Sequence, residues 1–264
     1  FRSVTGRALR EYGRLDEIVL ATKVFWPMGE GPNLSGLSRK HVVQACEASL
    51  RRLGVETIDL YQIHRFDAAT PIEETLAALD HLVHAGKVRY VGASSGWAWR
   101  MAQALSASER NGWARFVSMQ NHYNLVYREE EREMIPLCRA EGIAVIPWSP
   151  LARGLLAGSR VSLDDRASTA RAATDEYGRG LYTEPGDWEV VEATRAVAAE
   201  RGVSPAEVAL AWLLSKPAVT APIVGATRLA HLDTAIRAVK LTLTDEEIAR
   251  LEAPYRPHAV RGHG

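Results

Sequence analysis

The sequence predicts an α/β protein in which parallel strands alternate with helices. Short apolar runs of β-prone residues alternate along the chain with amphipathic segments of helical period. Continuous apolar strands are typical of parallel sheets, which helices cover. A polar residue or a glycine also stands at the end of every expected strand. The expected strands cover residues 18–23, 58–64, 88–94, 115–120, 143–149 and 219–225.

The expected helices begin and end at recognisable capping residues. Ser38 and Gly54 stand where an N-cap and a C′ glycine belong. Thr70 and Glu73 have capping-box spacing around Pro71. The expected helices run up to Gly13 and then over 38–54, 70–86, about 98–107, about 129–141 and 187–201, with later helices opening at Ser204, after Gly225, and at Thr244 with capping-box spacing to Glu247.

Two arrangements of such a sheet remain open, a doubly wound open sheet and a (β/α)8 TIM barrel. No strand is followed by a G-x-G-x-x-G turn, which weakens the open dinucleotide-binding sheet. Polar strand ends favour the barrel, whose site collects residues from several strands. A barrel needs eight strands, so its first two would lie before Phe1. We expect one N-terminally incomplete barrel domain over 1–264, with a long loop at about 158–187.

Composition excludes several function classes. Lys plus Arg and Asp plus Glu both total 32, so no bulk charge attracts nucleic acid or an anionic membrane. No apolar run approaches the ~20 residues that span a bilayer. Cys46 and Cys138 fall on apolar helix sides, which predicts buried free thiols and a cytoplasmic location. The histidines have no H-x-H or H-E-x-x-H spacing, so we expect no metal site.

Lys23 and His64 are the candidate catalytic residues. Alone, a lysine at a strand end usually extends to solvent, and a histidine there is usually structural. In a barrel the two adjacent strand ends bring Lys23 and His64 toward the same mouth. A buried ammonium lowers the pKa of a neighbouring phenol, and a histidine can orient a carbonyl oxygen. The pair therefore suits proton transfer to a carbonyl.

Other strand ends suit the parts of a nucleotide cofactor. Ser94, Ser95 and Gln120 offer neutral donors and acceptors for a carboxamide. Trp148 offers a flat face on which an aromatic ring would stack. Each fragment alone also fits ordinary loop chemistry, so the interpretation depends on their order and on their strand-end positions.

Two later segments suit phosphate groups. The segment "SPLARGLLAG" offers backbone N–H groups, Ser149 and Arg153 to a pyrophosphate. The segment "GATRLAH" leaves the last strand and enters a helix, whose N-terminus favours a phosphate. Arg228 or His231 would hold a further phosphate there.

Taken together, these motifs resemble the aldo-keto reductase family. The segments "LATKV", "IDLYQIHR", "GKVRYVGASS", "FVSMQNHYNL", "IPWSPLARGLLAG" and "PIVGATRLAHL" appear in the family's order and cover essentially the whole chain. The closing "LTDEEIARLEAPYRPH" resembles a bacterial branch related to potassium-channel β subunits. The resemblance implies a (β/α)8 barrel that binds NADPH across its mouth and passes hydride to an aldehyde or ketone.

The resemblance also implies roles for individual residues. Lys23 and His64 match the lysine and histidine of an Asp-Tyr-Lys-His tetrad, whose Asp and Tyr would lie before Phe1. Tyr12 follows the first helix and does not match the tetrad tyrosine. Phe25 and Trp26 would line the substrate pocket. The implied cofactor contacts are Ser94, Ser95, Gln120, Trp148, Ser149, Leu151, Arg153, Gly154, Gly225, Thr227, Arg228 and His231.

Two functions follow from this resemblance. The first is an NADPH-dependent carbonyl reductase with a small carbonyl substrate. The second is a redox-sensing subunit that holds NADP with little turnover. Either would be compatible with a homo-oligomer. A metal-dependent barrel hydrolase is disfavoured by the histidine spacing.

Overall fold

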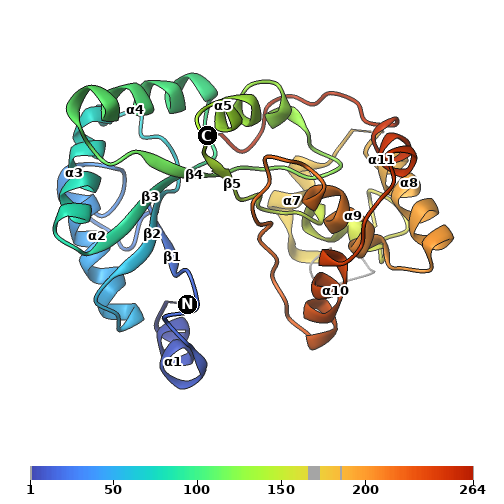
Figure 1. The fold of residues 1–264 in the computed structure, drawn as a ribbon, viewed down its shortest axis with the longest axis horizontal. Helices are drawn as coiled ribbons and strands as arrows, with labels where there is room; N and C mark the ends of the chain where they lie inside the picture. Colours follow the sequence, from blue (N-terminus) through green and yellow to red (C-terminus); the bar gives the residue numbers. More distant parts are fainter. Residues whose placement is uncertain (1, 166–172, 185, 264) are drawn as a thin grey trace. The chain divides into compact units, whose positions relative to one another are not determined.

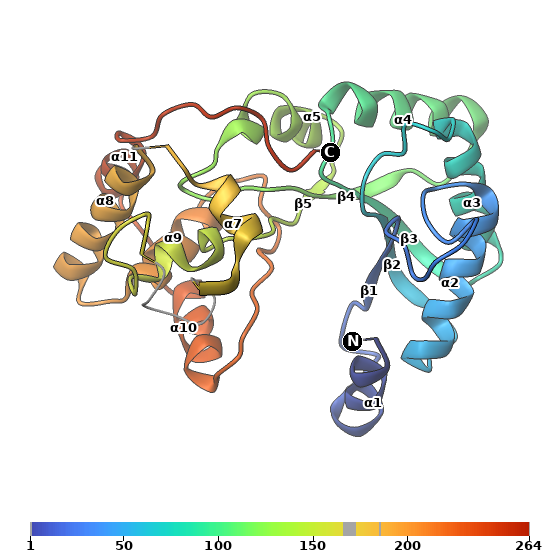
Figure 2. The same ribbon diagram turned by 180° about the vertical axis from the view of Figure 1, so that it is seen from behind.

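The computed structural model describes residues 2–165, 173–184 and 186–263 (Figures 1 and 2). The chain forms two compact units. The first unit comprises Phe1–Gln120, Ala140–Ile143 and His263–Gly264, and the second comprises Asn121–Arg139 and Ala144–Gly262. We describe each unit by itself.

The first unit is built on four parallel strands in sequence order. Side chains alternate between its two faces, so Tyr61 and Ile63 point to one face and are fully buried. Figure 1 shows the helices that follow the strands along one side of the sheet. Gln62 and His64 therefore belong to the opposite face. The strands are β1 (Ala21–Val24), β2 (Ile58–Ile63), β3 (Val88–Ser94) and β4 (Phe116–Gln120).

The expected first strand is shorter and more exposed than its apolar sequence predicts. Ile18 and Val19 precede β1 and are 41% and 76% exposed. Among the described residues β1 pairs with β2 alone, so the segment before it has no second neighbour to bury it. The prediction of a buried strand over 18–23 is therefore wrong, because the strand begins only at Ala21 and its first three residues are exposed or half-buried.

The helices of the first unit mostly begin and end as predicted. They are α1 (Arg2–Tyr12), α2 (Arg39–Leu53), α3 (Ile72–His84) and α4 (Ala98–Asn111). The Ser38 side chain caps α2, and Gly54 closes it in the left-handed conformation. The capping box at Thr70 is wrong, because the Thr70 hydroxyl donates instead to Asp67 Oδ2 at 2.9 Å.

The second unit surrounds a core that contains Trp212, whose indole N–H donates to Glu252 Oε1 at 2.8 Å. The predicted capping box at Thr244 and Glu247 is confirmed. Beyond β4 the chain forms η1 (Glu129–Glu131), α5 (Met134–Ala140), β5 (Ala144–Val145), η2 (Ala152–Ala157), α7 (Glu176–Leu181), α8 (Gly186–Arg201), α9 (Pro205–Leu214), α10 (Leu229–Val239) and α11 (Asp245–Glu252).

The last two expected strands differ most from the structure. The strand expected over 143–149 shortens to β5, and residues 219–225 form no strand. Val219 still bridges Val145 in parallel, and the Ile223 N–H donates to the Pro147 carbonyl at 2.9 Å. Pro147 and Pro222 have no N–H to continue a ladder, which explains the interruption. Within the described ranges the sheet therefore has five strands rather than the six expected.

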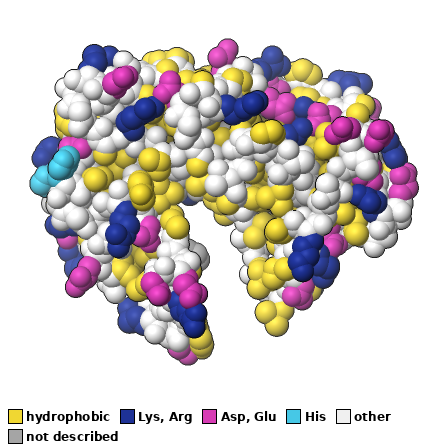
Figure 3. Space-filling view, in the orientation of Figure 1, with side chains coloured by type: hydrophobic (Ala, Val, Ile, Leu, Met, Phe, Trp, Pro, Cys, Tyr) yellow, Lys and Arg dark blue, Asp and Glu magenta, His cyan; other side chains and the backbone are white. Residues whose placement is uncertain are grey.

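Part of the expected long loop is helical. Within 158–187, α7 forms and α8 begins, while residues 166–172 and 185 lie outside the described residues. Further along, α10 presents an apolar stripe to solvent, visible as yellow side chains in Figure 3. The exposed side chains of this stripe are Leu229, Leu232, Ile236 and Val239.

The parallel α/β class and the free cysteines are confirmed. Neighbouring strands of the first unit pair in parallel, and helices alternate with them. Cys46 and Cys138 are buried and unpaired. Burial raises the pKa of each thiol to about 12, so both stay protonated at neutral pH.

Candidate active site

Lys23 and His64 lie on the same face of the first unit's sheet. Lys23 is the register partner of Gln62, two residues before His64, and side chains two apart share a face. The His64 N–H donates to the Val24 carbonyl at 2.9 Å, which extends the pairing of β1 and β2 by one residue. The two strands therefore present an ammonium and an imidazole at the same end of the sheet.

Burial and positive charge disfavour the protonated forms of both side chains. Burial lowers the pKa of Lys23, and the nearby Arg65 lowers it further. Burial, followed by the charges of Lys23 and Arg65, lowers the pKa of His64 to about 4. Arg65 is 8% exposed and donates to the His64 carbonyl at 2.6 Å. His64 is thus a neutral imidazole at physiological pH.

We expect the His64 imidazole to show no titration between about pH 5.5 and 8, because its pKa lies near 4. Histidine-selective NMR across this range measures the pKa directly. Lys23→Met should raise the pKa of His64, because it removes one of the positive charges that lower it. A wild-type titration near pH 6.5 would contradict the placement of these charges.

Phe25 and Trp26 form an aromatic edge beside His64. Their rings meet edge to face with centroids 5.0 Å apart. The Trp26 ring in turn meets the His64 ring with centroids 5.9 Å apart and an interplanar angle of 76°. Trp26 is 47% exposed, so part of its ring remains available to a ligand.

The ends of β3 and β4 are tied together at Ser94, Ser95 and Gln120. The Ser94 hydroxyl and the Ser95 N–H both donate to the Gln120 carbonyl, at 2.8 and 3.0 Å. Gln120 is 6% exposed, and its amide atoms are not among the fully buried polar atoms that lack a hydrogen-bond partner in the described residues. An amide at the end of a strand offers both a donor and an acceptor, so Gln120 suits a ligand carboxamide.

Gln62 and Arg65 were not singled out from the sequence. Gln62 is 1% exposed, and its Oε1 has no hydrogen-bond partner among the described residues. Gln62 on β2 is the register partner of Lys23 on β1 and of Gly92 on β3. A Cβ on Gly92 would lie 2.4 Å from the Ser118 hydroxyl and 3.1 Å from Gln62, so these two side chains occupy the space over the glycine. The sequence did contain a signal for Gln62, because it lies two residues before His64 and side chains two apart on a strand share a face.

Trp148 and Ser149 lie in the second unit. The Trp148 N–H donates to the Asn121 carbonyl at 2.9 Å, and its ring stacks on that of His122. The amide of Asn121 contacts Glu130 Oε2 at 3.4 Å rather than pointing to a ligand site. Sequence reasoning placed Trp148 at a strand end but did not single out His122.

The expected pyrophosphate segment forms a tight turn. Ser149, Arg153 and Gly154 all have positive φ, at 54°, 54° and 98°. Arg153 forms a two-point ion pair with Asp175, at 2.5 and 2.8 Å. The guanidinium of Arg153 is therefore engaged, which differs from the expectation that it is open to a phosphate. Leu151 is the N-cap of η2 within the same turn.

The expected adenosine-phosphate segment leads into α10. Gly225 and Thr227 are exposed, and the Thr227 N–H donates to His231 Nδ1 at 3.4 Å. Arg228 is the N-cap of α10 and makes no side-chain cap hydrogen bond. Arg228 also has no ion pair among the described residues, so its guanidinium is available to an anion.

The structure therefore gathers the expected residues as two groups, one in each unit. Residues up to Gln120 belong to the first unit, and those from Trp148 onward belong to the second. Within the described residues, no three His, Cys, Asp or Glu side chains are grouped so as to hold a metal ion. No helix in the described part of the chain is both long and apolar enough to cross a membrane.

Comparison with known proteins identifies the family. The family model for the aldo/keto reductase family matches residues 2–256. The chain is 40% identical to versiconal hemiacetal acetate reductase of Aspergillus parasiticus, over 97% of this chain and 79% of that protein. It is 47% identical to aldo-keto reductase AMT2 of Alternaria alternata, over 88% of this chain and 61% of the relative.

A putative aryl-alcohol dehydrogenase of Schizosaccharomyces pombe is 45% identical, over 87% of this chain and 64% of the relative. The chain thus spans less than two thirds of the length of two of these three proteins. All three relatives are fungal, and the expected link to a bacterial branch is not shown by them. The chain belongs to the aldo/keto reductase family of oxidoreductases, whose fold is the (β/α)8 barrel.

Proposed function

We propose that the full-length protein reduces aldehydes or ketones to alcohols by hydride transfer from NADPH. The observation that carries this proposal is the pairing of Lys23 and His64 at one end of adjacent parallel strands, where the imidazole is neutral. A neutral imidazole can donate a hydrogen bond to a carbonyl oxygen through its one ring N–H. The family match over residues 2–256 supports the same reaction class.

In this proposal the substrate oxygen lies near His64, and Lys23 acts on a neighbouring acid. The ammonium of Lys23 lowers the pKa of a tyrosine hydroxyl that protonates the oxygen. That tyrosine and the aspartate that pairs with Lys23 are expected upstream of Phe1. Phe25 and Trp26 would border the substrate, and an aromatic substrate suits their rings.

NADPH, when bound, supplies the hydride. The buried amide of Gln120 fits the nicotinamide carboxamide, with Ser94 and Ser95 beside it. Trp148 would stack on the nicotinamide ring, and Arg228 would pair with a phosphate. The other residues that we propose for the cofactor are Ser149, Leu151, Arg153, Gly154, Gly225, Thr227 and His231.

The substrate class is proposed as small aromatic aldehydes. One relative is named a putative aryl-alcohol dehydrogenase, and an aldehyde is the oxidised form of such an alcohol. The exposed ring of Trp26 beside His64 supports an aromatic substrate. We further propose a cytoplasmic location and a homo-oligomer.

The test offers the full-length protein NADPH together with a panel of aromatic and aliphatic aldehydes. The loss of NADPH absorbance measures the rate of NADPH oxidation with each aldehyde. We expect turnover with the aromatic members and slower turnover with NADH. If no aldehyde of the panel were turned over, the proposed carbonyl reductase activity would be contradicted. If the same protein held NADP tightly and exchanged it slowly, the second function, a redox-sensing subunit of the channel-β type, would replace it.

A further inference from the structure

We propose that His122 is a positioning residue that fixes the plane of the Trp148 ring before the cofactor binds. The inference rests on the proposed function, in which Trp148 stacks on the nicotinamide. It concerns residues of the second unit only. Neither His122 nor its hydrogen-bond partner Tyr182 was implied by the sequence motifs.

His122 is the middle ring of a three-ring stack. Its ring centroid lies 4.1 Å from that of Tyr127 with an interplanar angle of 13°. On the other side it lies 4.3 Å from that of Trp148 with an angle of 11°. His122 and Tyr127 are fully buried, whereas Trp148 is partly exposed. The stack is therefore closed at the tyrosine and ends at the tryptophan, the one ring of the three that is partly exposed.

A hydrogen bond prevents the middle ring from rotating. His122 Nε2 lies 2.7 Å from the hydroxyl of Tyr182. Asn124 Nδ2 donates to that hydroxyl at 3.1 Å and also lies 3.4 Å from His122 Nε2, so both groups that face this nitrogen are donors. Burial raises the pKa of Tyr182, which keeps the hydroxyl hydrogen in place. His122 Nε2 is thus an acceptor, which fixes both the tautomer and the ring plane.

Asn124 connects this network to the residue after Trp148. Its Nδ2 also donates to the Ser149 carbonyl at 2.9 Å. Its Oδ1 accepts from the N–H groups of Val126 and Tyr127, both at 3.0 Å. One asparagine therefore holds the start of the expected pyrophosphate turn, the Tyr182 hydroxyl and the backbone of the outer ring.

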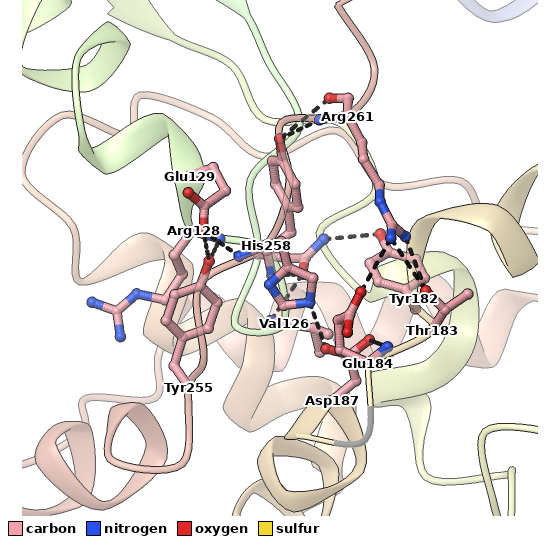
Figure 4. Close-up of polar contacts among 12 residues, drawn as sticks. Val126, Arg128, Glu129, Tyr182, Thr183, Glu184, Asp187, Tyr255, His258 and Arg261 are labelled. Atoms are coloured by element: carbon pink, nitrogen blue, oxygen red, sulfur yellow. Dashed lines mark hydrogen bonds and ion pairs between the residues drawn. The ribbon is translucent and has the colours of Figure 1, made fainter.

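The outer ring is held by the end of the chain. The Tyr127 hydroxyl accepts from the Arg261 N–H at 2.9 Å. The Arg261 guanidinium contacts Thr183 and Glu184, next to Tyr182 in sequence (Figure 4). Both outer supports of the stack thus come from segments distant in sequence, the tail and the residues that follow α7.

A phenylalanine at position 122 would keep a ring in the stack but would have no acceptor for Tyr182. The stack would then be free to tilt, and the exposed face of Trp148 would no longer be fixed before binding. Fixing a binding surface in advance lowers the entropy lost when the ligand binds. The hydrogen bond from Tyr182 to His122 is therefore expected to act on cofactor affinity and on the orientation of the nicotinamide.

The test compares His122→Phe and Tyr182→Phe with Tyr123→Phe in the full-length protein. Tyr123 is a matched control, because it is 1% exposed and its hydroxyl donates a partly buried hydrogen bond to Glu131 at 2.6 Å rather than to a residue of the stack. We expect His122→Phe and Tyr182→Phe to raise the Kd of NADP, measured by calorimetry, by about threefold to tenfold. This change corresponds to the loss of one hydrogen bond. We expect the control to change the Kd by less than about twofold.

A second readout reports the nicotinamide orientation. With NADPH deuterated at either of the two C4 positions, the wild type should transfer one of them selectively, and His122→Phe should lose part of that selectivity. A simple loss of folded protein would lower the rate without changing this selectivity. Unchanged Kd and selectivity in both variants, or an equal change in Tyr123→Phe, would overturn the inference. Wild-type NADP binding without any aldehyde turnover would instead contradict the proposed function, and the Kd comparison would still decide the role of His122.

Discussion

Replacing Lys23 with methionine is expected to lower kcat for aldehyde reduction by about a thousandfold, within the range of general acid–base effects. Methionine keeps the length of the side chain but removes the ammonium. Without that charge the pKa of the proposed tyrosine acid returns toward about 10, and the hydroxyl becomes a poorer proton donor to the substrate. The rate loss should therefore be in the chemical step.

The Kd of NADPH for Lys23→Met should remain within about twofold of the wild type, because Lys23 is not among the proposed cofactor contacts. Single-turnover kinetics with excess NADPH measure the chemical step directly. Lys40→Met, which removes an exposed lysine at the start of α2, is the control and should keep the wild-type rate. Substantial hydride transfer by Lys23→Met would contradict the proposed role.

The parts of the fold that depend on neighbouring residues could be predicted from the sequence. The caps of α2 and α11 involve residues within four positions of each other, so Ser38, Gly54 and Thr244 were sufficient signals. Strands β2 and β3 form where the short apolar runs predicted them, and most of their residues are buried. The Thr70 cap failed because the N-cap of α3 is Pro71 and the Thr70 hydroxyl donates to Asp67 in the preceding loop.

The parts that depend on distant contacts could not be predicted. Tyr182 lies sixty residues beyond His122, and no local pattern links a tyrosine in a polar segment to that histidine. The ion pair of Arg153 could not be predicted either, because its partner Asp175 lies 22 residues further along. The apolar run at Ile18 and Val19 predicted burial, but burial also requires a neighbouring segment that residue patterns alone do not supply.

The second large effect is expected at the buried pair of His258 and Asp187. The two side chains are each 1% exposed, and His258 Nε2 lies 2.6 Å from Asp187 Oδ1. The His258 N–H donates to Glu129 Oε1 at 2.7 Å, so the pair also fixes the tail against η1 (Figure 4). Asp187→Asn would leave the histidine buried without its counter-charge, which costs about 3–5 kcal/mol of unfolding free energy.

This pair also sets the sign of a pH dependence. Burial alone would lower the pKa of His258, but the hydrogen bond and charge of Asp187 outweigh it, with further contributions from Glu129 and Glu184, and raise the pKa. A raised folded-state pKa stabilises the fold fully below the unfolded value of about 6.5. The stabilisation is lost as the pH rises through the folded-state pKa.

The free energy of unfolding of the wild type, measured with urea, should therefore fall as the pH is raised from about 6. Asp187→Asn should lower the free energy at pH 6 and remove most of this fall, because the charge that raises the pKa of His258 is gone. Glu192→Gln is the control, since Glu192 pairs with Arg195 at the surface and its removal should cost less than about 1 kcal/mol. If Asp187→Asn kept both the wild-type stability and its pH slope, the His258–Asp187 pair would contribute nothing to holding the segment around His258. The support that Arg261 gives to the ring stack would then depend on the contacts of Arg261 alone.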